Sequence, residues 1–146
     1  MKKLLGLFRR PEPAVKAIDH QSLGHVVWER EDWWKGSFSF EGNTIEFFLA
    51  GHDQPDPVCT AACLEAIASF SLIRDRVSAF IAQEIPKHGY LQLDLSVDDF
   101  VIESINFMWP NKPDYCMILF DNAKDEYGMW NCELIKGEPK HLNRDD

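Results

Sequence analysis

The fold is decided by residues 33–49, whose sequence is Trp33-Trp34-Lys35-Gly36-Ser37-Phe38-Ser39-Phe40-Glu41-Gly42-Asn43-Thr44-Ile45-Glu46-Phe47-Phe48-Leu49. Gly42-Asn43 separates two alternating apolar runs and is typical of a two-residue hairpin loop. With that loop, Phe38 lies opposite Phe47 on an apolar face, while Ser39 and Glu46 share the other face. Because a one-residue slip would mix the two faces, the sequence predicts a hairpin with Phe38 and Phe47 in the core.

The pattern changes to a helical period after this hairpin. Asp56-Pro57 is a typical helix start, with Asp as the N-cap and Pro at the first position. A buried stripe follows at Cys59, Ala62, Cys63, Ala66, Ile67 and Phe70. A second helix is predicted over residues 72–84, and Ser96 to Asp99 have the spacing of a capping box.

Further strands are predicted on both sides of these elements, over residues 26–30, 105–109, 115–120 and 130–135. The segment Tyr115–Phe120 is apolar on both faces, which is typical of a strand that is covered on both sides. The order of elements indicates an α+β fold with an antiparallel sheet of about five to six strands. We expect two helices, inserted after the first hairpin and packed on one face of the sheet.

Length and composition indicate a single domain. The chain has 146 residues, of which 45% are hydrophobic, and this supports one core but not two domains. Residues 1–20 carry five basic and two acidic side chains, a net charge of +3. Pro11-Glu12-Pro13 interrupts any helix there, so we expect a flexible basic N-terminal arm over residues 1–20 and one α+β domain over residues 21–146.

The remaining residues carry 10 basic and 22 acidic side chains, a net charge of −12. A domain with this charge repels nucleic acid and attracts a basic protein partner. Leu4 to Phe8 is too short for the apolar region of a secretory signal, and no segment is long enough to span a membrane. We therefore expect a bacterial cytoplasmic protein, whose arm is compatible with only weak contact to an anionic membrane surface.

The sequence offers no motif for a metal or a cofactor. Cys59, Cys63, Cys116 and Cys132 lack CxxC spacing and lie in apolar segments, so we expect four reduced, buried thiols. Asp121–Glu126 lacks the length and the glycine of a calcium loop. We expect no metal and no cofactor.

The search for catalytic residues also finds none, because glycine-rich phosphate loops and the common hydrolase motifs are missing from the sequence. His52 and Asp53 could form a base–carboxylate pair, but no nucleophile or oxyanion donor accompanies them. We interpret this segment as a surface loop and expect a non-enzymatic protein.

Acidic and aromatic residues are concentrated around the start of the first hairpin. They are Glu29, Glu31, Asp32, Trp33 and Trp34. A surface that docks a basic protein uses such a combination, because aromatic side chains anchor the partner and carboxylates steer it. The alternative is that the tryptophans belong to the core and the acids to a solvated turn.

Several segments together resemble a known group of proteins. They are Trp34-Lys35-Gly36 with its hairpin, the two-helix insert, Leu95-Ser96-Val97-Asp98-Asp99-Phe100, Glu103-Ser104-Ile105-Asn106-Phe107, Met117-Ile118-Leu119-Phe120-Asp121, and the Trp130 strand ending in Gly137-Glu138-Pro139. Over residues 25–142 the chain resembles small acidic bacterial domains found among immunity proteins of contact-dependent and other polymorphic toxin systems. Such families often carry a Gly-His pair in the penultimate hairpin, where this chain has Asp121-Asn122-Ala123-Lys124.

The resemblance implies a protein-binding domain that neutralises a basic toxin domain. A second hypothesis, from a different class, is a domain that binds a small molecule in a pocket between sheet and helices. An unrecognised enzyme belongs to this second hypothesis.

Overall fold

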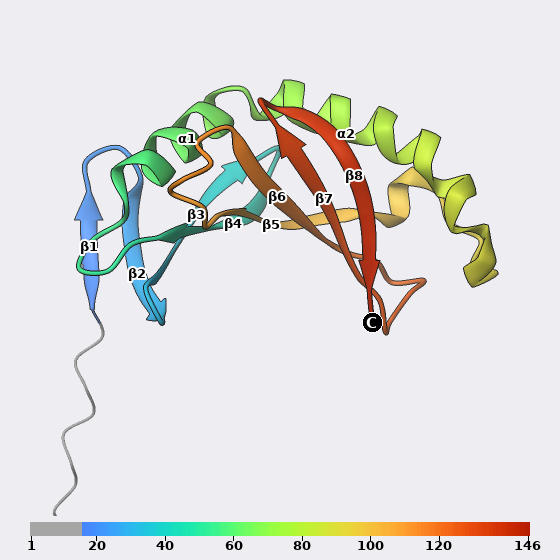
Figure 1. The fold of residues 1–146 in the computed structure, drawn as a ribbon, viewed down its shortest axis with the longest axis horizontal. Helices are drawn as coiled ribbons and strands as arrows, with labels where there is room; N and C mark the ends of the chain where they lie inside the picture. Colours follow the sequence, from blue (N-terminus) through green and yellow to red (C-terminus); the bar gives the residue numbers. More distant parts are fainter. Residues whose placement is uncertain (1–15) are drawn as a thin grey trace, which may run out of the picture.

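The computed structural model describes residues 16–146. The helical elements are α1 (Pro57–Ala68), α2 (Phe70–Glu84) and the 3₁₀ helices η1 (Ile85–Leu91) and η2 (Val97–Asp99). The strands are β1 (Ala17–His20), β2 (Gly24–Arg30), β3 (Trp33–Phe40), β4 (Asn43–Ala50), β5 (Val101–Phe107), β6 (Tyr115–Asp121), β7 (Met129–Ile135) and β8 (Glu138–Asp145). Figure 1 shows α1 and α2 on one side of a single sheet.

The described strands form one eight-stranded sheet in chain order. Every neighbouring pair is antiparallel except β4 and β5, which are parallel and are joined by the helical segment. The expected α+β class and mostly antiparallel sheet are confirmed, but the strand number of about five to six was too low. Strands β1 and β8 were missed. Both are edge strands, and their polar sequences carry little apolar alternation. The helices therefore follow the fourth strand, although the hairpin before them is the predicted one.

The hairpin has the predicted faces but a different register. Its loop is Glu41-Gly42, with φ of 49° and 79°, so Phe38 pairs with Ile45 and Phe47 pairs with Gly36. A shift of two residues keeps every side chain on its face. The reason for this register is steric, because the Phe47 ring covers Gly36 so closely that a Cβ there would overlap it.

The start of α1 is confirmed. The Asp56 side chain accepts hydrogen bonds from the backbone N–H groups of Val58 (2.8 Å) and Cys59 (3.1 Å), and Pro57 occupies the first helical turn. The capping box at Ser96 and Asp99 also forms. The predicted apolar stripe is divided at Ser69, where α1 ends, so Phe70 belongs to α2.

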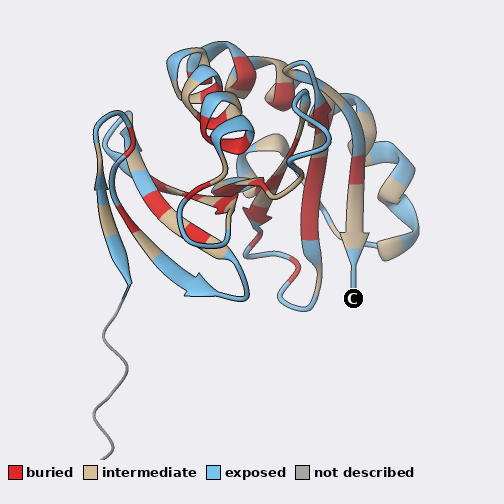
Figure 2. Cartoon of the chain, turned by 60° about the vertical axis from the view of Figure 1, so that its left-hand side comes forward, coloured by how far each residue is buried: buried red, intermediate tan, exposed pale blue. Residues whose placement is uncertain are grey.

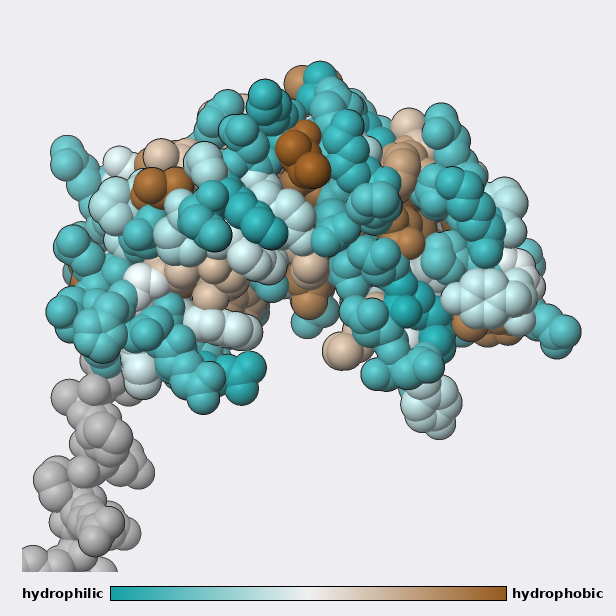
Figure 3. Space-filling view, in the orientation of Figure 1, coloured by the Kyte–Doolittle hydropathy of each residue, from teal (hydrophilic) through white to brown (hydrophobic). Residues whose placement is uncertain are grey.

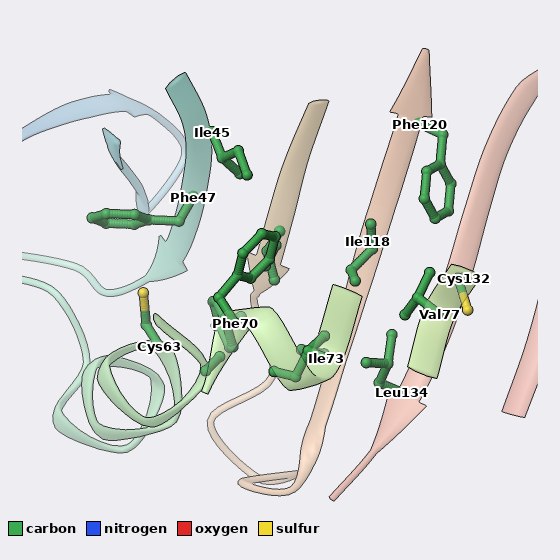
Figure 4. Packing of buried hydrophobic residues seen from close by; sticks show 14 of the residues in the cluster. Ile45, Phe47, Cys63, Phe70, Ile73, Val77, Ile118, Phe120, Cys132 and Leu134 are labelled. Carbon is green, nitrogen blue, oxygen red and sulfur yellow. The ribbon is translucent and has the colours of Figure 1, made fainter. Parts of the chain in front are cut away.

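The core lies between the helices and one face of the sheet. Figure 4 shows Phe70, Ile73 and Val77 of α2 directed toward Ile118 and Leu134 of the sheet. In Figure 2 the buried residues likewise concentrate where helices and strands meet. All four cysteines are buried and unbridged, and they pack as small apolar side chains.

The boundary expected at residue 20 is wrong for its last residues. Ala17–His20 is strand β1, and Ile18 pairs with Val26 and packs against the core. Residues 1–15 of the predicted arm lie outside the described part of the chain. The sheet therefore begins before residue 21.

Candidate functional site

The predicted acidic and aromatic cluster is only partly at the surface. Glu29, Glu31 and Asp32 are exposed around the β2–β3 turn. Trp33 is half-buried and contacts Phe48 edge-on, with ring centroids 6.3 Å apart. The inclusion of Trp34 among the docking residues is wrong because its side chain is fully buried.

Trp34 has a structural role. Its indole N–H donates to the Gly51 carbonyl at 3.0 Å, so the ring fixes the loop that follows β4. Beside this loop, His52 Nδ1 lies 2.6 Å from Asp32 Oδ1 and Nε2 lies 3.9 Å from Asp53. The hydrogen bond with Asp32 raises the pKa of His52. The imidazole is 82% exposed, and within residues 16–146 no nucleophile is hydrogen-bonded to it, so what the structure shows here is a link between two surface turns.

A larger surface lies on the side of the sheet opposite α1 and α2, which we call the helix-free face. Successive residues of a strand point to opposite faces, and Phe47, Ile105 and Ile118 point into the helix-covered core. Their neighbours therefore point outward. One row across six strands contains Lys35, Phe48, Asn106, Met117, Glu133 and His141. The adjacent row contains Ser37, Glu46, Ser104, Leu119, Asn131 and Asn143.

The middle of the helix-free face is apolar. Phe48, Met117 and Leu119 lie there, and all three are half-buried although none of the described helices covers them. Aromatic side chains extend this surface through Trp33 and through the edge-on contact of Tyr115 with Trp109, at 4.6 Å between centroids. In Figure 3 the lower outline is hollowed between β1–β2 on the left and β7–β8 on the right, and pale to brown surface lines the hollow.

Carboxylates surround this apolar surface. The strand residues that point to the helix-free face include five acids, Asp19, Glu46, Asp121, Glu133 and Asp145, and two cations, Arg30 and Lys35. Each cation already has a partner on the face. Lys35 lies 3.5 Å from Glu46, and the Arg30 guanidinium lies 4.9 Å above the Trp33 ring. Lys112 adds a further positive charge 5.4 Å from the Tyr115 ring, but the acids still outnumber the cations, which makes the potential on this side of the sheet negative.

Polar side chains among the apolar ones fix part of the surface. Asn143 donates to Asn131 at 3.1 Å, and Asn131 donates to Asp145 at 3.0 Å. The Tyr115 hydroxyl donates to Glu133 at 2.6 Å. Among the described residues, the side-chain oxygen of Asn106 is buried without a hydrogen-bond donor. Buried polar atoms are normally paired, so this oxygen is an exception on the face.

The sequence does not predict this face, because the apolar residues of β6 are compatible with either a covered or an exposed surface. The second apolar set of β6, Met117 and Leu119, predicts a strand that is covered on both sides. The helices cover only the side of Cys116 and Ile118. The alternation in β6 therefore indicated an exposed apolar surface as much as a buried one.

The Asp121–Glu126 segment, rejected as a calcium loop, contains an ion pair with a structural role. Asp125 accepts hydrogen bonds from Arg144 Nε at 2.7 Å and from the Trp130 indole at 2.7 Å. The bond from Arg144 lowers the pKa of Asp125. This pair ties the β6–β7 loop to β8 and is directed away from the helix-free face.

On the helix side, two cavities open to the surface. One, of about 430 Å³, lies between the helices and β6. The other, of about 300 Å³, lies between the tip of the β3–β4 hairpin and α2. Both are separated from the helix-free face by the sheet.

No protein family, curated protein or solved structure matches this chain. Among the described helices, none alone is long and apolar enough to cross a membrane, although α1 taken with α2 and η1, bent by 80°, passes a test of length and composition.

Proposed function

We propose that this protein is a non-enzymatic binding domain that docks a basic protein on the helix-free face. The observation that carries the proposal is an apolar surface, centred on Phe48, Met117 and Leu119, that lies opposite α1 and α2 and has five carboxylates around it. Apolar side chains give an interface its affinity, and a surrounding charge speeds the encounter.

The resemblance to immunity proteins supplies the class of partner. A toxin domain that acts on nucleic acid is basic because it must bind phosphate groups, and an acidic face complements such a domain in charge. The acidic turn at Glu29, Glu31 and Asp32 adjoins the same face through Trp33 and extends it.

The test is an association-rate measurement against the product of the adjacent gene, at low and at high salt. Glu46→Lys with Glu133→Lys reverses two charges on the face. The matched control is Glu65→Lys with Asp98→Lys, which makes the same change in net charge elsewhere on the surface. We expect the face variant to slow association at low salt by about tenfold and the control to leave it nearly unchanged.

Equal effects of the two variants would refute docking on this face, because only total charge would then matter. A wild-type chain that does not bind the adjacent gene product, together with a product that is harmless when expressed alone, would refute the immunity function. Melting temperatures of both variants, measured in parallel, separate loss of binding from loss of fold.

A second candidate function is favoured by one specific observation. The expected pocket between sheet and helices has a counterpart in the 300 Å³ cavity beside α2. A cavity of this size is at the lower end of the range of small-molecule sites. Binding there would be compatible with docking on the opposite side of the sheet.

A further inference from the structure

The 300 Å³ cavity, which we call the hairpin cavity, is enclosed by elements distant in sequence. The tip of the β3–β4 hairpin forms one wall, α2 forms another, and η2 with the start of β5 closes the third side. Its lining is mixed: apolar side chains such as Phe40, Phe70 and Val77 share it with polar ones such as Glu41, Arg74 and Ser78. An occupant with both an apolar body and a charged end matches this lining.

The walls are held in place by core packing. Phe70 contacts Phe40 edge-on at 4.7 Å, and Phe100 contacts Phe120 in the same way at 5.8 Å. Phe70, Val77 and Phe120 are themselves buried. Rings fixed in this way keep the cavity open without a ligand, because closing it would require the core to repack.

Among the described residues that line the cavity, Arg74 is the one cation. The Arg74 guanidinium lies 5.1 Å above the Phe40 ring, and its Nη1 is 2.8 Å from the Glu41 carboxylate. Its Nε is paired with Asp75 at 2.9 Å. The contact with Phe40 places the guanidinium beside the cavity, where it can bind a carboxylate once Glu41 is displaced.

Glu41 is a weakly held partner for Arg74. Its side chain is 61% exposed and belongs to the hairpin loop. Exposed ion pairs of this kind contribute little to stability. A ligand carboxylate attached to an apolar body can therefore replace Glu41, because burial of that body adds favourable binding free energy that the Glu41 side chain does not supply.

We propose that the hairpin cavity binds a medium-chain monocarboxylate, with its hydrocarbon among the phenylalanines and its carboxylate on Arg74 in place of Glu41. The site is independent of docking on the helix-free face. Failure of either proposal leaves the other standing.

The test uses octanoate as the probe and octan-1-ol as its uncharged comparison, titrated into the full-length chain. Methyl NMR signals of Ile45, Val77 and Ile81 report on the cavity, since all three side chains line it. We expect both probes to shift these signals and octanoate to bind about fivefold more tightly.

Three variants separate the contributions. Arg74→Gln should remove the preference for octanoate and leave octan-1-ol unaffected. Glu41→Gln should tighten octanoate binding alone, because it removes the competing carboxylate. Ser78→Phe, at a half-buried lining position, should weaken binding of both probes by filling the cavity.

The control is Glu46→Gln, which removes a carboxylate on the opposite face of the sheet. It should change neither affinity, and a tightening equal to that of Glu41→Gln would overturn the proposal by showing an effect of total charge. Equal binding of the two probes to the wild type would also overturn it. So would the absence of any shift at Ile45, Val77 and Ile81 at millimolar octanoate.

Discussion

The contact between Gly36 and Phe47 determines the hairpin register and can be tested by a double-mutant cycle. Phe47→Ala removes a ring that is fully buried against the helices. Gly36→Ala adds the Cβ that would overlap that ring. The two changes are opposite in kind, and each alone should destabilise the protein.

The structure sets the magnitudes. A fully buried phenylalanine truncated to alanine loses its transfer free energy and leaves a cavity, together about 3–5 kcal/mol. Gly36→Ala forces a buried ring to move, which corresponds to overpacking at about 1–3 kcal/mol. Once Phe47 is alanine the space is free, and alanine is then favoured over glycine in a strand by about 0.5–1 kcal/mol. Gly36→Ala should thus change sign in the Phe47→Ala background.

The assay is urea unfolding of the four proteins, with the midpoint and the slope fitted separately. A coupling free energy of about 1.5 kcal/mol or more is expected, as for residues in direct contact. Additive effects would refute the register, because the alternative with Phe38 opposite Phe47 places no ring over Gly36. Phe38→Ala with Gly36→Ala is the matched control and should be additive.

Three further predictions follow from the pKa shifts and the sheet edge. His52 should titrate by NMR with a pKa above the ordinary value of 6.5, and Asp32→Asn should return the pKa toward that value. The contact stabilises the fold below pH 6.5, and this stabilisation is lost as the pH rises through the raised pKa. An unchanged NMR titration midpoint of His52 in Asp32→Asn would contradict the role given to Asp32. Burial raises the pKa of Cys116 to about 12 and of Cys59 to about 11, so a thiol reagent at pH 8 should modify no cysteine in the folded protein and all of them in urea. A chain that begins at Gln21 lacks β1 and should melt below one that begins at Lys16, whereas equal melting temperatures would show that β1 contributes nothing.

The faces of the hairpin could be predicted from sequence, but its register could not. Alternation places Phe38 and Phe47 on the core side in either register. Both Glu41-Gly42 and Gly42-Asn43 are acceptable loops, so local chemistry leaves the choice open. The deciding contact joins Phe47 to Gly36 across the strands, and a glycine gives no sign of what covers it.

The candidate site shows a different limit. Alternation from Phe38 back to Trp34 already placed Trp34 in the core, yet proximity in the chain grouped it with the exposed acids. The strand pattern was the better guide. For β6, by contrast, the sequence contains no signal that separates a face buried by helices from one reserved for a partner, because Met117 and Leu119 have the same apolar character in both cases.

The single parallel pair has a consequence for how the chain folds. It divides the sheet into two meanders, β1–β4 and β5–β8, each made only of contacts between neighbours in sequence. Joining β4 to β5 requires closure of the long segment that contains both helices, and long closures are entropically unfavourable and slow. Each meander can therefore form early, while the seam between them forms late. A break in the chain between Ala50 and Val101 would yield two fragments suited to reassembly.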